Sequence, residues 1–197
     1  MTFRIEEKLL INKENILDFK EYIKNKSAKK IYQRRKIESL YFENTDCQMY
    51  VDSIEGLTPR KKIRIRNYPE TKDKKFYLET KISSVEGRFK TRSILSKNKL
   101  NELKNIGILD SQYGTCKPFL YVDYYRDYFQ LNDVRISIDN NISYKLFAGG
   151  AIKSDQSSIV ELKTSIKKNL DELVFDFPFQ KIRFSKYCNA IEKIIFN

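Results

Sequence analysis

Alternation of apolar and polar residues along this chain predicts mainly β-strands, because successive side chains of a strand point to opposite faces. Eight segments show the pattern, and mostly short polar connections separate them. They are Thr2–Ile11, Glu38–Glu43, Lys61–Tyr68, Lys75–Ser83, Arg88–Ile94, Tyr121–Leu131, Val134–Asp139 and Ser158–Thr164. A run of strands of this kind predicts an antiparallel sheet or barrel.

Three other segments have apolar residues at helical spacing, namely Asn12–Asn25, the stretch between Ser96 and Gly107, and KYCNAIEKIIF at 186–196. Ser96 is a typical helix N-cap and Gly107 a typical stop. The sequence therefore predicts an α+β protein dominated by strands. Because no long linker and no internal repeat interrupts it, we expect one domain over residues 1–197.

Most predicted strands have one charged face and one apolar face. In KKIRIRNY, for example, Lys62, Arg64 and Arg66 share one side while Ile63 and Ile65 share the other. Two interpretations remain open: an open sheet whose charged face meets water, or a closed barrel with a charged interior. The second gains weight because like charges on neighbouring strands repel one another unless a bound anion relieves the repulsion.

Composition supports a polyanionic ligand and excludes several kinds of chemistry. Lys and Arg number 38 against 26 acidic residues, a formal charge of +12, which attracts anions. The chain has no histidine, so histidine-based catalysis is excluded, and its three widely spaced cysteines predict neither a zinc site nor a disulfide scaffold. The N-terminus is not a signal peptide, and no apolar run approaches the ~18 residues of a membrane span. We expect a cytoplasmic protein.

A barrel interior lined with Arg and Lys suits a linear phosphate chain. Arginine donates forked hydrogen bonds to phosphate oxygens, and lysine supplies a movable positive charge. The few carboxylates on the same faces, Glu6, Glu79 and Glu161, are predicted to hold a hard divalent cation. Such cations bind through one or two carboxylates together with substrate phosphates.

Seven motifs in order carry a resemblance to a known family. They are RIEEKLLI, SLYFENTD, RKKIRIRNY, LETK, YYRDYFQLNDVRISID, VELKTS and RFSKY. In this order they resemble the VTC domain, the catalytic module of polyphosphate polymerases within the triphosphate tunnel metalloenzyme superfamily. The resemblance implies an eight-stranded antiparallel tunnel β-barrel with a charged lumen, flanked by helices. It also implies transfer of the ATP γ-phosphoryl group to inorganic polyphosphate with Mn²⁺ or Mg²⁺.

Site residues follow from the same resemblance. The predicted catalytic cations are Arg64, Arg66, Lys163 and Lys186. Further phosphate contacts are predicted at Lys8, Lys62, Lys81, Lys90, Arg92, Arg126, Arg135 and Ser185, although the pattern leaves open which of Arg88, Lys90 and Arg92 face the phosphates. Glu161 is the predicted metal ligand, with Glu6 and Glu79 in support.

One departure from the superfamily concerns the first motif. Tunnel triphosphatases typically begin with E-x-E-x-K, whereas this chain has R-x-E-x-K, with Arg4 at the first acidic position. This loss of a carboxylate favours a polymerase over a two-metal hydrolase. Two alternatives remain: a tunnel triphosphatase acting on inorganic triphosphate or a nucleoside triphosphate, and a non-catalytic polyanion-binding module. We expect ATP and polyphosphate as partners, no specific nucleic acid, and room for a membrane-protein partner.

Overall fold

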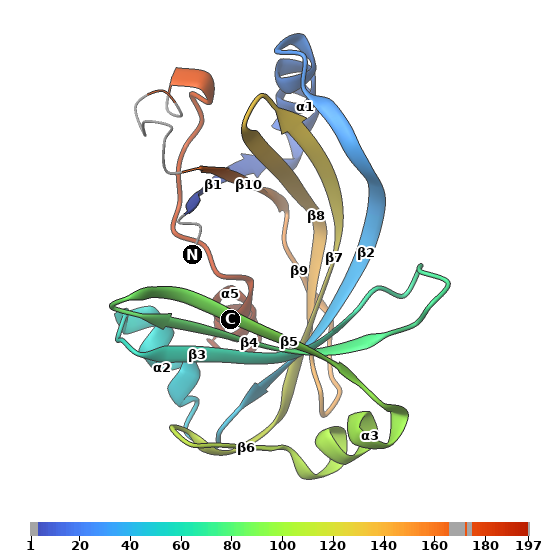
Figure 1. The fold of residues 1–197 in the computed structure, drawn as a ribbon, viewed down its shortest axis with the longest axis vertical. Helices are drawn as coiled ribbons and strands as arrows, with labels where there is room; N and C mark the ends of the chain where they lie inside the picture. The colour runs from blue at the N-terminus through green and yellow to red at the C-terminus, as the bar shows by residue number, and fades with distance from the viewer. Residues whose placement is uncertain (1–3, 166–171, 173–174, 197) are drawn as a thin grey trace. The chain divides into compact units, whose positions relative to one another are not determined.

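The computed structural model describes residues 4–165, 172 and 175–196. Its strands are β1 (Arg4–Asn12), β2 (Lys29–Glu43), β3 (Arg60–Asn67), β4 (Phe76–Ser84), β5 (Gly87–Leu95), β6 (Ile108–Asp110), β7 (Gly114–Leu131), β8 (Val134–Leu146), β9 (Lys153–Ser154) and β10 (Ser157–Ser165). They form an antiparallel ten-stranded sheet in the order β1-β10-β8-β7-β2-β3-β4-β5, with β6 paired to β7 and β9 to β8 (Figure 1). The predicted α+β class is confirmed.

The closed eight-stranded barrel is not confirmed. Eight strands lie on the main path of the sheet, but β1 and β5 stand at its two ends and do not pair with each other among the described residues. A different segment occupies the outer edge of β1. The Leu10 N–H donates to the Gln180 carbonyl, and the Ile182 N–H donates to the Lys8 carbonyl. The residues around Lys181 therefore take the hydrogen bonds that a closing strand would need at this edge.

Residue contacts divide the chain into two compact units, each built from distant parts of the sequence. Unit 1 contains residues 1–35, 124–142 and 154–184, and unit 2 contains residues 36–123, 143–153 and 185–197. The long strands β2, β7 and β8 contribute residues to both units. One domain over the whole chain remains a prediction.

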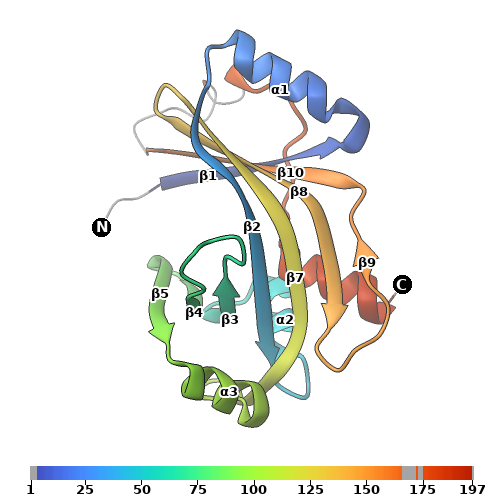
Figure 2. The ribbon, with the colours of Figure 1, turned by 90° about the vertical axis from the view of Figure 1, so that its right-hand side faces the viewer.

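The core of unit 1 lies between one helix and the apolar face of the sheet. Helix α1 (Ile16–Asn25) lies next to β1, β8 and β10 (Figure 2). It buries Phe19 and Ile23 in a cluster that includes Leu9 of β1 and Ile138 of β8. Burial of such side chains contributes about 1.5–3 kcal/mol each, so this face fixes the orientation of the strands. The opposite, charged faces of β1, β8 and β10 are thereby left to carry the candidate site.

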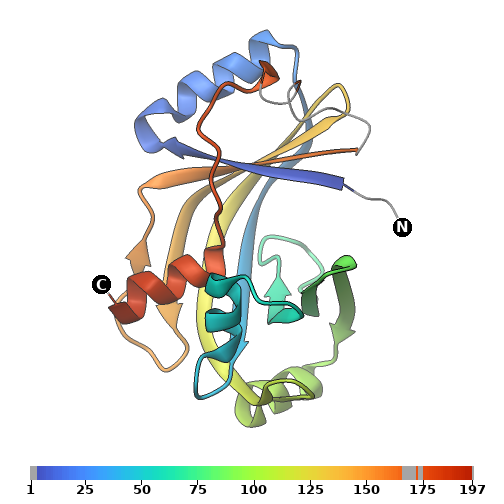
Figure 3. The same ribbon diagram turned by 90° about the vertical axis from the view of Figure 1, so that its left-hand side faces the viewer.

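Unit 2 contains helices α2 (Gln48–Glu55), α3 (Lys97–Ile106) and α5 (Lys186–Ile191), the last followed by a π-helical turn at Glu192–Phe196. Helices α2 and α5 lie side by side (Figure 3). The predicted ends of α3 are confirmed: the Ser96 hydroxyl accepts from the Lys99 N–H, and Gly107 follows the helix with φ 98°. A Cβ at Gly107 would lie 2.5 Å from the Cys116 carbonyl oxygen, so only glycine fits.

Several elements were not predicted. Helix α2 begins after Cys47, whose own side chain does not cap it. Asn44 accepts from the Gln48 N–H, and Glu43 accepts from the Met49 and Tyr50 N–H groups. The first half of β2 was not predicted either, because its residues are mostly exposed on both faces and show no apolar–polar alternation. Among the described residues, no helix combines the length and the apolar composition that crossing a membrane requires.

Candidate phosphate-binding site

The predicted site residues divide between the two units. Unit 2 holds Lys62, Arg64, Arg66, Glu79, Lys81, Lys90, Arg92, Ser185 and Lys186, whereas unit 1 holds Glu6, Lys8, Arg126, Arg135, Glu161 and Lys163. In unit 2, three adjacent strands align these residues in rows. Lys62, Lys81 and Lys90 pair across β3, β4 and β5, and the next row contains Arg64, Glu79 and Arg92. Like charges placed directly across strands repel, so the row of three lysines favours a bound anion.

Glu79 is the centre of the unit 2 cluster. Its side chain is only 2% exposed, and its Oε2 accepts from Arg64 Nε at 2.9 Å and Nη2 at 2.7 Å. Its Oε1 accepts from Lys90 Nζ at 2.7 Å. Arg92 and Arg66 approach to 3.5 and 3.8 Å. Burial by itself would raise the pKa of Glu79. The nearby cations, Arg64 and Arg66 foremost, outweigh burial and lower this pKa to about 2.

This arrangement leaves surplus positive charge. One carboxylate is shared by four cations, and both of its oxygens already accept hydrogen bonds. The structure thus brings Lys90 and Arg92 to the same carboxylate as Arg64, which the sequence pattern alone left open. A divalent cation at Glu79 would have to displace Lys90 or Arg64. Glu79 as a metal ligand therefore remains a prediction without support from this geometry.

Ser185 connects the first row of cations to helix α5. Its hydroxyl accepts from Lys62 Nζ at 2.8 Å and from the Cys188 N–H at 3.3 Å, so it also caps the helix. Lys62 additionally lies 5.4 Å above the ring of Tyr187. Lys186, the first residue of α5, follows Ser185 directly and is half-buried. Ser185 and Tyr187 of the RFSKY motif thus both contact Lys62 of β3.

Three residues behind this cluster were not predicted from the sequence. The Tyr41 hydroxyl accepts from Arg64 Nη1 at 2.8 Å, and the Tyr41 ring stacks on Tyr187 at 5.1 Å between centroids. The Tyr187 hydroxyl in turn donates to Glu43. Burial raises the pKa of Glu43 to about 7, although three backbone N–H groups donate to this carboxylate. Tyr41 therefore positions Arg64, and Tyr187 and Glu43 support Tyr41. In the sequence, the one indication of these residues was that they lie within the motifs SLYFENTD and RFSKY.

In unit 1, strands β1, β10 and β8 place the other predicted residues side by side. Glu6 pairs with Lys163, and Lys163 with Arg135; one step along, Lys8 pairs with Glu161. Lys163 Nζ lies 3.3 Å from Glu161 Oε1 and 3.7 Å from Glu6 Oε2, so it bridges the two carboxylates. Lys8 Nζ donates to the Phe184 carbonyl at 2.6 Å and lies 3.8 Å from Glu6.

Arg126 on β7 is anchored by an acidic partner. Its Nε and Nη2 donate to the two oxygens of Asp139 at 2.5 and 2.7 Å, and Asp139 is fully buried. Arg126 Nη2 also lies 3.6 Å from Glu161 Oε2. Burial by itself would lower the pKa of Arg126, but the negative charge of Asp139 outweighs burial and raises this pKa well above its ordinary value. Asp139 is thus committed to orienting the guanidinium beside Glu161.

A divalent cation fits the carboxylates of unit 1 better than the carboxylate of unit 2. Glu6 and Glu161 offer hard oxygen ligands whose ion pairs with lysine and arginine are long, between 3.3 and 3.8 Å. Over residues 4–165 and the described C-terminal part, no group of three or more His, Cys, Asp or Glu side chains could hold a metal alone. Oxygens from a phosphate substrate would complete the coordination, as is usual for Mg²⁺.

Comparison with known proteins now decides the family. The family profile of the VTC domain matches residues 3–195, almost the whole chain. The chain belongs to the VTC domain family. A comparison with curated proteins found no match.

Solved structures share the fold of this VTC domain. A Bacillus halodurans protein described as a candidate adenylate cyclase is 17% identical, with a TM-score of 0.65 and coverage of 98% of both chains. A Pyrococcus horikoshii protein is also 17% identical, with a TM-score of 0.62 and coverage of 97% of this chain and 99% of its own. A Hippeastrum adenylyl cyclase candidate with a dominant triphosphatase activity is 13% identical, with a TM-score of 0.54 and coverage of 98% and 94%.

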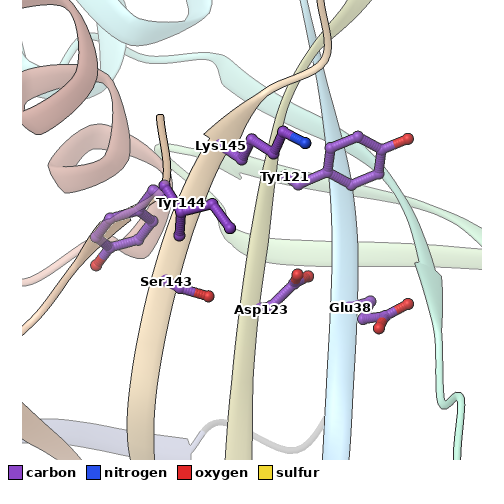
Figure 4. A pocket seen from close by; sticks show the side chains of 7 residues that line it. Glu38, Tyr121, Asp123, Ser143, Tyr144 and Lys145 are labelled. Carbon is purple, nitrogen blue, oxygen red and sulfur yellow. The ribbon is translucent and has the colours of Figure 1, made fainter. Parts of the chain in front are cut away.

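The VTC domain also has a cavity away from the predicted residues. In unit 2, a pocket of about 270 Å³ is lined by Glu38, Tyr121, Asp123, Ser143, Tyr144, Lys145 and Ile152 of β2, β7, β8 and the segment after β8 (Figure 4). One oxygen of Asp123 is buried and has no hydrogen-bond partner among the residues that the structure describes. Burial, together with nearby Glu38, raises the pKa of Asp123 to about 6. The two carboxylates make this pocket unsuitable for a polyanion.

Proposed function

We propose that this VTC domain is a polyphosphate polymerase that transfers the γ-phosphoryl group of ATP to a growing inorganic polyphosphate chain. The observation that supports it most is the surplus of cations in both units, above all the four cations that share Glu79. Membership of the VTC family supports the same proposal. A chain of phosphates neutralises such a surplus better than a single small anion, because it carries one negative charge or more per unit.

Phosphoryl transfer depends mainly on positioning and on electrostatic stabilisation of charge on the transferring oxygens. Arg64 and Arg66 supply forked donors from β3, while Lys62 and Lys186 supply point charges near Ser185. In unit 1, Lys163 and Arg126 contact phosphate oxygens. The attacking terminal phosphate is already anionic near neutral pH, so the absence of histidine is no obstacle.

Mn²⁺ or Mg²⁺ is proposed at Glu161 and Glu6, where it would neutralise charge on the phosphates. When phosphates and the cation bind, Lys163 moves from its position between the two carboxylates to a phosphate oxygen. Lys163 is suited to this change because its ion pairs with Glu6 and Glu161 are long and its side chain is about one third exposed.

A tunnel triphosphatase is the second candidate, since one similar structure is described as having a dominant triphosphatase activity. It uses the same electrophile with water as the nucleophile. Against it stands Arg4 in the first motif, where triphosphatases typically carry a carboxylate. We propose that the protein acts in the cytoplasm on ATP and polyphosphate, alone or with a membrane-protein partner.

Incubation of the full chain with ATP and Mn²⁺ or Mg²⁺ tests the proposal. We expect polyphosphate ladders on a gel, with ADP formed in proportion, and no product when EDTA removes the metal. Release of free phosphate alone would favour the triphosphatase. Metal-independent binding of polyanions without any turnover would favour the non-catalytic module.

A further inference from the structure

A cluster of two arginines and two tyrosines continues the basic face of unit 1 onto β2. The ring of Tyr128 lies 5.5 Å from the ring of Tyr32, edge to face. The guanidinium carbon of Arg35 lies 5.3 Å from the centroid of Tyr32 and 5.8 Å from that of Tyr128. Arg135 lies 5.9 and 5.7 Å from the same two centroids. Two guanidinium groups thus share one pair of rings.

Acidic partners are missing from this cluster as far as the structure describes the chain. Over residues 4–165 and the described C-terminal part, neither Arg35 nor Arg135 forms an ion pair with a carboxylate, and both are exposed. Arg126, by contrast, is held by Asp139. Holding two like charges near the same rings is unfavourable unless an anion lies between or beside them. The cluster is therefore arranged for negative charge that the described residues do not supply.

The kind of anion follows from what the cluster leaves accessible. The tyrosine rings already carry guanidinium groups, so they offer little free surface for stacking a base. Arginine keeps its in-plane N–H groups for phosphate oxygens when its flat face contacts a ring. Arg135 also pairs across β8 and β10 with Lys163, a predicted catalytic cation. The cluster is therefore continuous with the phosphate-binding site of unit 1.

We propose that Tyr32, Arg35, Tyr128 and Arg135 form an extension of this site, which binds phosphate groups of a linear polyphosphate chain beyond the length of a triphosphate. The inference rests on the proposed function and adds a place where a long chain, as opposed to ATP, is held. Arg35 and Tyr32 are its new members. The two tyrosines hold the guanidinium groups and do not contact the transferring phosphate.

Arg34 provides a matched control on the same strand. It is equally exposed, and its guanidinium carbon lies 4.4 Å from the ring centroid of Tyr125. Tyr125 alternates with Arg126 and therefore belongs to the other face of β7. Arg34→Gln and Arg35→Gln remove the same charge and a similar cation–π contact. Arg35→Gln removes a charge beside Tyr128, on the face of the sheet that carries Arg126. Arg34→Gln removes a charge beside Tyr125, on the opposite face.

Calorimetric titration of the full chain with long-chain inorganic polyphosphate and with inorganic triphosphate tests the extension. We expect Arg35→Gln to weaken long-chain affinity about three- to tenfold, the effect of one charge-assisted contact in partial contact with water, with triphosphate affinity unchanged. Arg34→Gln should change neither affinity. Tyr32→Leu should lower long-chain affinity in the same direction, and Arg35→Lys should restore part of it.

Four outcomes would overturn the extension. The first is an equal loss of affinity for triphosphate and for long chains in Arg35→Gln, and the second is an equal loss of long-chain affinity in Arg34→Gln and Arg35→Gln. The third is no loss of affinity in Arg35→Gln. The fourth is a rise in the KM for ATP in Arg35→Gln with polyphosphate affinity unchanged, which would indicate a base-binding site. If the wild type binds long chains through Arg35 but neither binds triphosphate nor turns over ATP, the polymerase proposal fails and the extension stands. If the wild type binds neither anion, both fail.

Discussion

Glu79 in unit 2 and Glu161 in unit 1 begin the same short pattern, E-x-K, yet their surroundings differ. Glu79 is 2% exposed and accepts hydrogen bonds from Arg64 and Lys90 at 2.7–2.9 Å. The ion pairs of Glu161 are longer, at 3.3 Å to Lys163 and 3.6 Å to Arg126. The difference arises from the neighbouring strands, since β3 and β5 both present cations to Glu79 whereas β8 presents Ser137 to Glu161.

This contrast separates two roles for a carboxylate in a basic site. A carboxylate with every oxygen hydrogen-bonded to cations stabilises their positions and holds them together against repulsion. A carboxylate with loose partners can exchange them for a metal ion at small cost. We therefore propose an organising role for Glu79 and a metal-binding role for Glu161 with Glu6, and the following predictions test that proposal.

The largest expected effect is on turnover. Glu161→Gln keeps the volume of the side chain but removes the charge that would bind the divalent cation, so metal-dependent transfer should fall on the order of 1000-fold or more. The rate of ADP release against Mn²⁺ concentration measures it. Circular dichroism should show an unchanged fold. If Glu79→Gln rather than Glu161→Gln abolishes the metal dependence, the two roles are reversed.

The next effect is on stability. Glu79→Gln leaves Arg64, Arg66, Lys90 and Arg92 close together without their shared carboxylate, and loss of one partner of a buried ion pair costs about 3–5 kcal/mol. Urea unfolding near pH 7 measures this loss. Glu102→Gln, which removes an exposed pair with Lys99, is the matched control and should cost ~0–1 kcal/mol. Similar losses in the two variants would contradict the organising role.

The same substitution should change the response to acid. Because the pKa of Glu79 is lowered from 4.5 to about 2, its stabilising contribution is complete above pH 4.5 and is lost as the pH falls towards 2. The difference in unfolding free energy between wild type and Glu79→Gln should therefore shrink over this interval.

The smallest effect concerns Asp123, a partly buried carboxylate whose charge is not fully offset by nearby cations. The pKa of Asp123 is raised from 3.8 to about 6, so the folded state loses stability as the pH rises through that interval. Asp123→Asn removes this loss and should be the more stable protein, relative to wild type, above pH 6 than near pH 4. Thermal unfolding at the two pH values should show a relative change of about 1–2 kcal/mol, because the partial exposure of Asp123 reduces the effect of a shift of about two pKa units. A change of opposite sign would mean that a cation pairs with Asp123.

Alternation predicted much of the fold because most strands have one apolar face. It missed the first half of β2, where both faces are exposed, and it missed α2, whose N–H groups are satisfied by Asn44 and Glu43 rather than by the residue that precedes the helix. The closed barrel was not confirmed, since residues 180–182 bond to the outer edge of β1. A contact between segments so distant in sequence leaves no local signal.

For the candidate site, the sequence told which side chains share a strand face but not which strands are neighbours. Register decides that Lys62, Lys81 and Lys90 form one row and that Arg64 and Arg92 flank Glu79. The contact between Tyr41 and Tyr187 likewise depends on where α5 packs. The sequence pattern therefore predicted which residues belong to the candidate site, but it could not predict roles that depend on pairing between strands.

The edges of the sheet have a consequence for how copies of this protein meet. An unpaired strand edge can add a strand from another molecule and so begin aggregation. On β1 the chain's own residues 180–182 block that route. On β5 no such cover is described, but Arg88, Lys90 and Arg92 are exposed along it, so two such edges would repel each other in water. Cations proposed to attract phosphate thus also keep neighbouring molecules apart, and abundant polyanion would remove that protection.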